Sequence, residues 1–235
     1  MAGRSMRWWI RIPLILIGIL LGVQLWFFGW VMVWRATEPG PTQFMRIRLE
    51  ELQRKYPGAR LQHQWVPYSQ ISVNLKRALV AAEDSKFMQH QGFDVAGIQK
   101  AMEKNEKRGH IAAGGSTITQ QLAKNLFLWP EKSFLRKGEE ALITVMIEAT
   151  WSKRRILEVY MNEIEWGTGI FGAEAAARHY FGISANDLSP AQAAMLASMV
   201  PSPQYYDRQG ETEGLIRQTD VILERMNKVA IPPNR

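Results

Sequence analysis

One glutamate, Glu83, stands where a carboxylate could act as a general base. Leu75 and Leu79 lie on an apolar stripe at helical spacing, and Glu83 continues that stripe eight residues after the first and four after the second. Its carboxylate would be removed from water and would lie near the negative end of the helix dipole, and both effects raise a pKa. Such a carboxyl group suits proton abstraction. The alternative is a helix end where Glu83 turns to water or pairs with Lys86.

A second candidate feature is the stretch from residue 114 to 125, Gly-Gly-Ser-Thr-Ile-Thr-Gln-Gln-Leu-Ala-Lys-Asn. Thr117 with Gln120 three residues on predicts a capping box at a helix start. A helix start offers free backbone N–H groups and a positive dipole end, so it can bind a phosphate. One polar stripe at helical spacing holds Thr117, Gln120, Gln121 and Lys124. The alternative is a capped helix with a solvated polar face.

Charged residues also open a later predicted helix, at Arg136-Lys137-Gly-Glu-Glu140. Cations in a first turn run against the helix dipole, which indicates a ligand or partner that holds them. Arg136 and Lys137 could bind a diphosphate while Glu140 orients or balances them; a solvated charge run is the alternative. Further on, Arg154 and Glu158 are spaced for a helical i,i+4 ion pair, with Glu158 tying helices together.

The N-terminal region predicts a membrane anchor. Residues 12–34 form a run of 23 residues without charge, long enough to cross a bilayer core of about 30 Å. Arg4, Arg7 and Arg11 precede it and no acidic residue does, so the positive-inside rule places the N-terminus in the cytoplasm. No small-x-small cleavage site follows Trp34, which favours a retained anchor over a cleaved signal peptide.

Composition narrows the classes of function. The net charge is +7, and without the three arginines before the anchor 26 basic and 22 acidic residues remain, which suits a phosphate-bearing substrate or an anionic membrane. No basic and aromatic reading motif for nucleic acid is present. There is no cysteine, and the four histidines show no metal-ligand spacing, so neither a disulfide framework nor a zinc site is indicated.

The pattern after the anchor is helical almost throughout and contains no convincing period-2 strand, so we predict an all-α protein. The expected parts are a cytoplasmic N-terminus (1–11), a transmembrane helix (12–34), a connecting region (35–66) and one domain (67–235). Asp94, Ser152 and Ser189 are predicted helix N-caps, and Gly182 a C-cap. The charged stretch 103–110 is predicted to be a mobile loop, and it could be a lid.

These signals, in this order, resemble the family 51 glycosyltransferases, which polymerise peptidoglycan glycan strands. The resemblance covers roughly residues 67–206 and rests on several ordered motifs. The matching motifs are Glu83-Asp-Ser-Lys-Phe87-Met-Gln-His90-Gln-Gly92, residues 114–125, Arg136-Lys137-x-x-Glu140, Lys153-x-x-Ile-Leu-Glu158-x-Tyr160-x-Asn162, Gly167-x-Gly169-x-x-Gly172 and Tyr180-Phe181-Gly182. The Ser-x-x-Lys and Lys-Thr-Gly motifs of bifunctional relatives are absent, so the resemblance is to the monofunctional members.

The resemblance implies a lysozyme-like α-helical glycosyltransferase domain and lipid II as substrate. The growing chain on undecaprenyl diphosphate is the donor, and Glu83 takes the proton from the acceptor 4-hydroxyl, which attacks with inversion. Glu140 is implied as the second catalytic carboxylate. The substrate-binding residues implied are Ser116, Thr117, Gln120, Gln121, Lys124, Asn125, Lys132, Arg136 and Lys137. A divalent cation (Mg or Mn) with the diphosphate is a further expectation, although the sequence shows no dedicated set of metal ligands.

Two positions depart from the family pattern. Lys132 stands where relatives often carry arginine, which keeps the charge but loses bidentate phosphate binding. Gln192 stands where glutamate is frequent, and its capping role makes that change harmless. The apolar run 126–130, Leu-Phe-Leu-Trp-Pro, could enter the outer leaflet and guide the lipid tail, or could belong to the core.

The implied setting is the bacterial inner membrane, with a single pass and a periplasmic catalytic domain. The implied partners are membrane lipids, lipid II, the growing glycan chain and other cell-wall synthesis proteins, without nucleic acid. Two rival functions remain open. A glycan-cleaving enzyme on a similar fold would need a protonated acid at the scissile oxygen and no diphosphate site. A non-catalytic membrane-anchored scaffold would not need Glu83 or Glu140.

Overall fold

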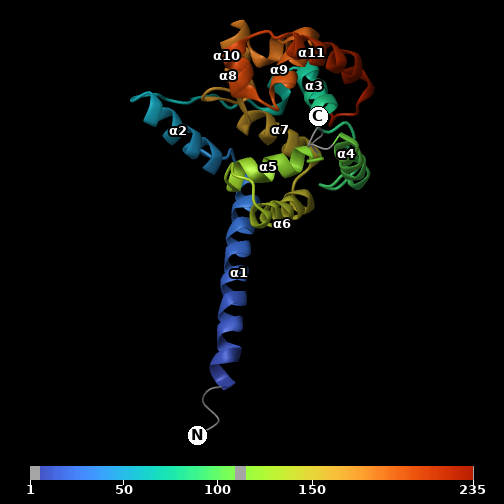
Figure 1. Cartoon of the computed structure of the whole chain (residues 1–235). Helices are drawn as coiled ribbons and strands as arrows, with labels where there is room; N and C mark the ends of the chain where they lie inside the picture. The colour runs from blue at the N-terminus through green and yellow to red at the C-terminus, as the bar shows by residue number, and fades with distance from the viewer. Residues whose placement is uncertain (1–5, 109–114, 235) are drawn as a thin grey trace. The chain divides into compact units, whose positions relative to one another are not determined.

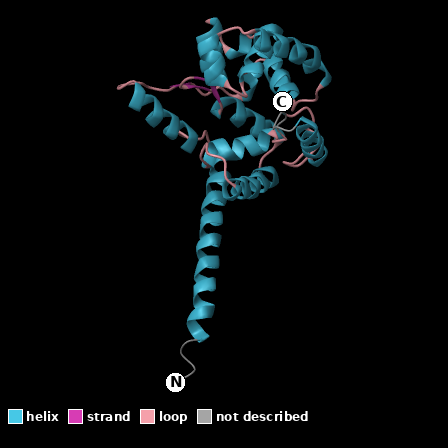
Figure 2. Ribbon diagram, viewed as in Figure 1, coloured by secondary structure: helices cyan, strands magenta, loops and turns pink. Residues whose placement is uncertain are grey.

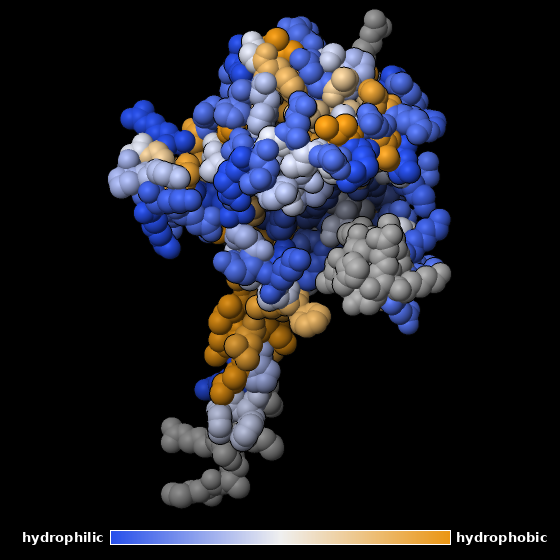
Figure 3. Space-filling model, turned by 45° about the horizontal axis from the view of Figure 1, so that its top comes forward, coloured by the Kyte–Doolittle hydropathy of each residue, from blue (hydrophilic) through white to orange (hydrophobic). Residues whose placement is uncertain are grey.

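The computed structural model describes residues 6–108 and 115–234 and divides into two compact units, Met1–Thr37 and Glu38–Arg235. The first unit is a single helix, α1 (Met6–Trp34), within which Arg11–Trp34 is long and apolar enough to cross a membrane. Large apolar side chains cover it, whereas the face of the second unit seen in Figure 3 is mostly hydrophilic. This helix is consistent with the predicted single-pass anchor.

The second unit is built almost entirely of helices, which confirms the predicted fold class (Figures 1 and 2). Its α-helices are α2 (Gln43–Lys55), α3 (Val73–Glu83), α4 (Val95–Arg108), α5 (Ile118–Phe127), α6 (Phe134–Thr150), α7 (Lys153–Glu163), α8 (Ala173–Phe181), α9 (Pro190–Met199), α10 (Pro203–Gln209) and α11 (Glu213–Arg225), with 3-10 turns at Tyr68–Gln70, Ala185–Asp187 and Met226–Lys228. Helix α2 lies in the region for which the sequence predicted no element.

A small sheet that the sequence did not predict accompanies the helices. Its strands are β1 (Gln62–His63), β2 (Glu165–Gly167) and β3 (Ile170–Phe171), in the order β1-β3-β2. β3 is parallel to β1 and antiparallel to β2. Every residue of β2 and β3 is buried, so these strands show no alternation of apolar and polar residues. A pattern search based on period two cannot detect strands this short and this buried.

The helix ends follow the predicted chemistry. The side chain of Ser152 accepts a hydrogen bond at the start of α7, and Ser189 with Gln192 forms a capping box at the start of α9. Gly182 ends α8 in the left-handed conformation, with a φ of 68°. Asp94 Oδ1 accepts a hydrogen bond from the Gly97 N–H at the start of α4. Local rules predicted these ends because a cap involves only neighbouring residues.

Three other predictions need correction. The stretch 103–108 is not a loop, because α4 continues to Arg108; residues 109 and 110 lie outside the described part of the chain. Glu158 pairs with Arg155 at 2.7 Å, and Arg154 instead lies over the Tyr68 ring. In the apolar run 126–130, the first three residues are buried in the core, and only the Trp and Pro that follow are partly exposed.

Packing in the second unit brings the end of α3 to the start of α5. Leu75, Ala78 and Leu79 are fully buried on the face of α3 that packs against α9, as the apolar stripe predicted. Each buried leucine contributes roughly 1.5–3 kcal/mol, so the orientation of α3 is firmly held. Helix α5 packs against α2, α6 and α7. The core therefore fixes the two segments that carry the candidate chemistry.

Candidate active site

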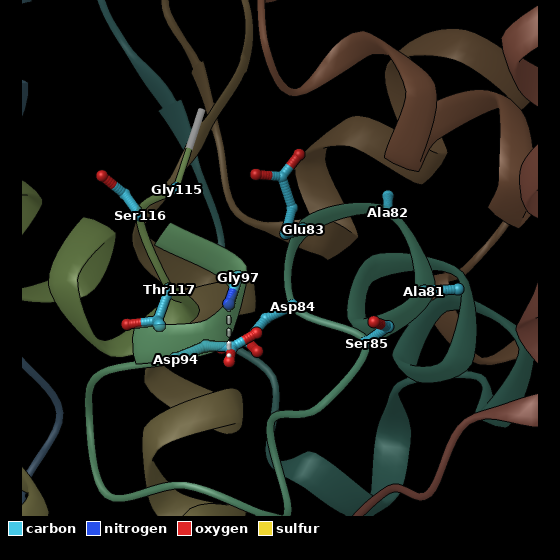
Figure 4. Close-up of a pocket in the computed structure, with 10 residues that line it drawn as sticks. All are labelled: Ala81, Ala82, Glu83, Asp84, Ser85, Asp94, Gly97, Gly115, Ser116 and Thr117. Carbon is cyan, nitrogen blue, oxygen red and sulfur yellow. Dashed lines mark hydrogen bonds between the residues drawn. The ribbon is translucent and has the colours of Figure 1, made fainter. Parts of the chain in front are cut away.

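Glu83 is the last residue of α3 and lines a cavity of about 160 Å³. The cavity is formed by the C-terminal end of α3, the start of α4 and the segment before α5. Figure 4 shows the Glu83 carboxylate on one side of this opening and Ser116 on the other, while the neighbouring Asp84 side chain points in a different direction. Two adjacent carboxylates therefore have separate surroundings and can have separate roles.

A chain of hydrogen bonds orients the Glu83 carboxylate. Gln121 Nε2 donates to Glu83 Oε2 at 2.7 Å, and the buried Tyr160 hydroxyl donates to Gln121 Oε1 at 2.9 Å. Burial raises the pKa of Glu83, and the Gln121 hydrogen bond and the Lys124 charge oppose that rise only partly. This confirms the predicted desolvation. The predicted alternative, a pair with Lys86, is not formed, since Lys86 Nζ lies 3.6 Å from an Asp94 oxygen.

Asp84 joins the end of α3 to the start of α5. The Ile118 N–H donates to Asp84 Oδ2 at 3.1 Å, and His90 Nε2 lies 2.8 Å from Asp84 Oδ1. The side chain of Asp84 is only 3% exposed. A carboxylate at a helix N-terminus is stabilised by the N–H groups and the dipole there. This clamp therefore holds Glu83 beside α5.

The start of α5 is partly occupied by acceptors from the chain itself. Thr117 and Gln120 form the predicted capping box, in which the Gln120 N–H donates to Thr117 Oγ1 and the Thr117 N–H donates to Gln120 Oε1. With the Ile118 N–H bound to Asp84, these three groups already have acceptors. The expectation of free N–H groups is wrong for these three, because the capping side chains accept from two of them and the Asp84 carboxylate accepts from the third.

Cationic side chains gather around Glu140 instead. The buried Arg136 lies 2.9 Å from one Glu140 oxygen, and the half-exposed Lys137 pairs with the other. Lys137 Nζ also donates to Ser116 Oγ at 3.2 Å, which brings α6 against the segment before α5. The predicted spacing of these residues thus produces real ion pairs. Two cations against one carboxylate leave excess positive charge for an anion.

Lys124 stands between the two carboxylates. Burial lowers the pKa of Lys124, and the neighbouring Arg136, Lys137 and Arg48 charges lower it further, whereas Glu140 acts in the opposite direction. The Lys124 charge also lowers the pKa of Glu83. The base and the cation cluster are therefore neighbouring parts of one site. An incoming anion would relieve the repulsion among these cations.

The remaining predicted residues divide between core and surface. Thr117, Gln120 and Asn125 are largely buried. Asn125 lines a second cavity, of about 190 Å³, with Gln121 and Lys124. Lys132 is exposed on the segment between α5 and α6. The ligand contacts predicted for these residues stay predictions.

Several residues of the site gained no role from the sequence. Asp84, His90 and Tyr160 lie inside the motifs that carry the family resemblance, and this membership was the signal that could have identified them. Phe44 and Arg48 come from α2, and both line the cavity beside Lys124. Nothing local in α2 indicated this, because its position depends on long-range packing.

Within residues 6–108 and 115–234, no group of three or more His, Asp or Glu side chains could hold a metal ion. Glu140 is already neutralised by Arg136 and Lys137. The described residues therefore do not form a set of metal ligands, and a divalent cation with the diphosphate stays a prediction. The arrangement is that of a helical group-transfer enzyme with a desolvated base and a cationic site for an anionic leaving group.

Comparison with known proteins identifies the family. A family model described as Transglycosylase matches residues 50–227. A biosynthetic peptidoglycan transglycosylase of Dechloromonas aromatica (strain RCB) is 60% identical over 225 residues, covering 95% of this chain and 97% of the relative. A protein of the same name from Azoarcus sp. (strain BH72) is 57% identical over 227 residues, covering 97% and 98%. The chain belongs to the transglycosylase family, which confirms the resemblance found in its motifs.

Replacing Glu83 by Gln is expected to stabilise the protein at neutral pH. The raised pKa means that the folded state disfavours the charged carboxylate, so stability is lost as pH rises through that pKa. Removing the charge should raise Tm by roughly 2–4 °C for a gain of about 1 kcal/mol. Thermal unfolding at pH 7 and pH 4 measures this, and the gain should shrink at pH 4. A lower Tm at pH 7 would contradict the desolvation argument.

Asp84→Asn is expected to loosen the joint between α3 and α5. The substitution removes the charge that the Ile118 N–H and His90 contact, and it should cost roughly 1–3 kcal/mol of stability. Denaturant unfolding measures the loss. Asp187→Asn, at an exposed carboxylate in the 3-10 turn after α8, is the control and should change stability by less than about 0.5 kcal/mol. Equal effects of the two variants would show that the clamp contributes nothing.

Proposed function

We propose that this protein is a peptidoglycan glycosyltransferase that polymerises lipid II into glycan strands and releases undecaprenyl diphosphate. The observation that carries the proposal is the proximity of Glu83 to the cations. Ser116, which lines the Glu83 cavity, accepts a hydrogen bond from Lys137. Lys124 lines a cavity with Gln121, which donates to Glu83. A transferase of this kind needs a base for the acceptor hydroxyl close to cations for the departing diphosphate. A glycan-cleaving enzyme has no use for the second part.

In the proposed reaction, Glu83 accepts the proton of the acceptor 4-hydroxyl as its oxygen attacks C1 of the donor sugar. The bond from C1 to the diphosphate breaks on the opposite face, so the configuration inverts. Negative charge develops on the departing diphosphate, where Lys124, Arg136 and Lys137 stabilise it. Glu140 keeps Arg136 and Lys137 in place through its two ion pairs. The Gln121 hydrogen bond keeps the Glu83 carboxylate aimed at the acceptor.

The proposal includes a location. Arg4, Arg7 and Arg11 precede the apolar run 12–34, and the glycosyltransferase unit follows it. The positive-inside rule therefore supports a periplasmic location for that unit, anchored in the inner membrane. Such a location gives the site direct access to a lipid-linked substrate. Other cell-wall synthesis proteins are natural partners there.

The function is tested by incubating full-length protein with labelled lipid II and separating the products on a gel. The wild type should give a ladder of glycan strands, and Glu83→Gln should lose at least 100-fold in rate, within the range of general-base catalysis. The wild-type rate should rise with pH through a pKa above that of an ordinary glutamate, because the deprotonated form is the base.

The matched control is Glu213→Gln, which removes an exposed carboxylate at the start of α11 and should keep full activity. A folded wild type without any ladder would contradict the proposal. Digestion of finished sacculi by that protein would then support the cleaving enzyme. An active Glu83→Gln variant would exclude Glu83 as the base.

A membrane contact of the second unit belongs to this proposal, with residues that overlap only partly with the predicted run 126–130. Phe134 is 100% and Leu135 73% exposed at the start of α6, and Trp129 is partly exposed before them. Lys132 lies between these apolar residues along the chain. Exposed aromatic and aliphatic side chains beside a lysine suit the boundary between lipid headgroups and acyl chains. We therefore assign the lipid contact to residues 129–135.

Because the chain has no cysteine, a single Phe134→Cys substitution can carry an environment-sensitive fluorophore. In vesicles, its emission should shift to the blue and be quenched by a quencher within the acyl region. Glu213→Cys, also exposed, serves as the control and should keep emission typical of water. The same water-like emission at both positions would rule out the contact.

A further inference from the structure

A groove leads away from the reaction centre along α2. The cavity of about 190 Å³ beside Gln121 and Lys124 shares two of its lining residues, Arg48 and Glu165, with a second cavity of about 310 Å³. The two cavities are therefore adjacent. On α2 the lining runs from Phe44 to Lys55, eleven residues along the helix, which corresponds to roughly 16 Å. A ligand longer than the reacting sugar could follow this path.

The charged residues in the wall between the two cavities are paired with one another. Arg48 Nε lies 3.2 Å from one Glu165 oxygen, and Gln204 Nε2 donates to the other at 2.8 Å. Arg48 Nη1 also pairs with Glu51 at 2.6 Å. These groups hold α2 against β2 and α10, and their charges are already used. They shape the groove but leave little attraction for a charged ligand.

Two other cations line the larger of these cavities, the one of about 310 Å³, and neither is paired with a carboxylate of the described residues. They are Lys55, at the end of α2, and Arg208, on α10, and both are exposed. Lys55 lies over the ring of Tyr56, which also lines the cavity. An open cavity with free cations on two of its elements, next to an aromatic ring, suits a carboxylate-bearing chain.

We propose that the cavity between α2 and α10 binds carboxylates on the peptides of the glycan chain that occupies the reaction centre. The inference rests on the proposed function, because that function supplies a chain that bears peptides. Each contact to an exposed cation is weak by itself. A second contact on a chain already bound at Glu83 is intramolecular, so even weak contacts can retain the chain between transfers. Lys55 and Arg208 would then help to set product length.

The first experiment compares product lengths from full-length wild type and from the double variant Lys55→Ala, Arg208→Ala. The double variant should give strands several-fold shorter. The control double variant Arg217→Ala, Lys228→Ala removes the same charge from exposed residues of α11 and the turn after it, and it should match the wild type. Lipid II with its peptide carboxyls converted to amides should make the wild type behave like the variant.

Equal lengths from wild type and double variant would overturn the proposal. So would a shortening that persists on the amidated substrate, because the cations would then bind something else. A shortening that appears only in vesicles of anionic lipid, and not in neutral detergent, would assign Lys55 and Arg208 to lipid headgroups.

A second measurement does not depend on transfer. Glu83→Gln protein in neutral detergent is mixed with purified peptide-bearing strands or with the same strands after amidation, and binding is measured directly. The untreated strands should bind several-fold more tightly, and the Lys55→Ala, Arg208→Ala changes should abolish that preference. Equal binding of both strands would overturn the proposal even in a protein that polymerises lipid II. A wild type that polymerises nothing would count against the proposed function instead.

Discussion

The carboxylate of Asp84 is the contact on which the site depends. Asp84 directly follows the last residue of α3, and its side chain accepts the first N–H of α5 and contacts His90. These contacts fix the distance between α3 and α5. Glu83 is the adjacent residue, and its position beside Gln121 follows from this joint. The same contact occupies one of the N–H groups at the start of α5, so the chain's own carboxylate takes a position there that an anion could otherwise take.

Three N–H groups at the start of α5 are occupied, and cationic side chains nearby supply further positive charge for a substrate. Arg136 and Lys137 oppose the dipole of α6, and Glu140 makes that placement tolerable by pairing with both. Lys124 is half-buried, and the positive charges of Arg136, Lys137 and Arg48 lower its pKa. Each of these features costs stability in the free protein. Together they define a place where an anion is stabilised, and a departing diphosphate is such an anion.

Helix α5 links structure and chemistry. One of its faces packs into the core, with Leu122 and Ala123 fully buried, while Gln121 and Lys124 face the cavities. The small sheet extends the site in the other direction, since β2 carries Glu165 into the wall shared by the two α2 cavities. Gln121 and Lys124 thus connect the surroundings of Glu83 with the cavities along α2. A polymerising transferase needs such a connection because its product remains attached to the reacting end.

The sequence by itself determined what depends on neighbours along the chain. The stripe of Leu75 and Leu79 placed Glu83 at a desolvated helix end, the caps at Thr117 and Ser189 fixed helix starts, and the spacing of Arg136, Lys137 and Glu140 gave ion pairs. Each of these features depends only on residues within one or two helical turns of each other. The order of the motifs along the chain indicated the family.

Only the tertiary structure decided which groups remain available to a ligand. Asp84 reaches Ile118 across 34 residues, and this contact occupies an N–H group that local reasoning left open. Arg48 meets Glu165 because α2 packs beside β2 and α10, a placement that no local pattern of α2 records. Whether a polar group already has a hydrogen-bond or ion-pair partner depends on segments that are distant along the chain. Local periodicity therefore located the chemistry, and packing determined its geometry.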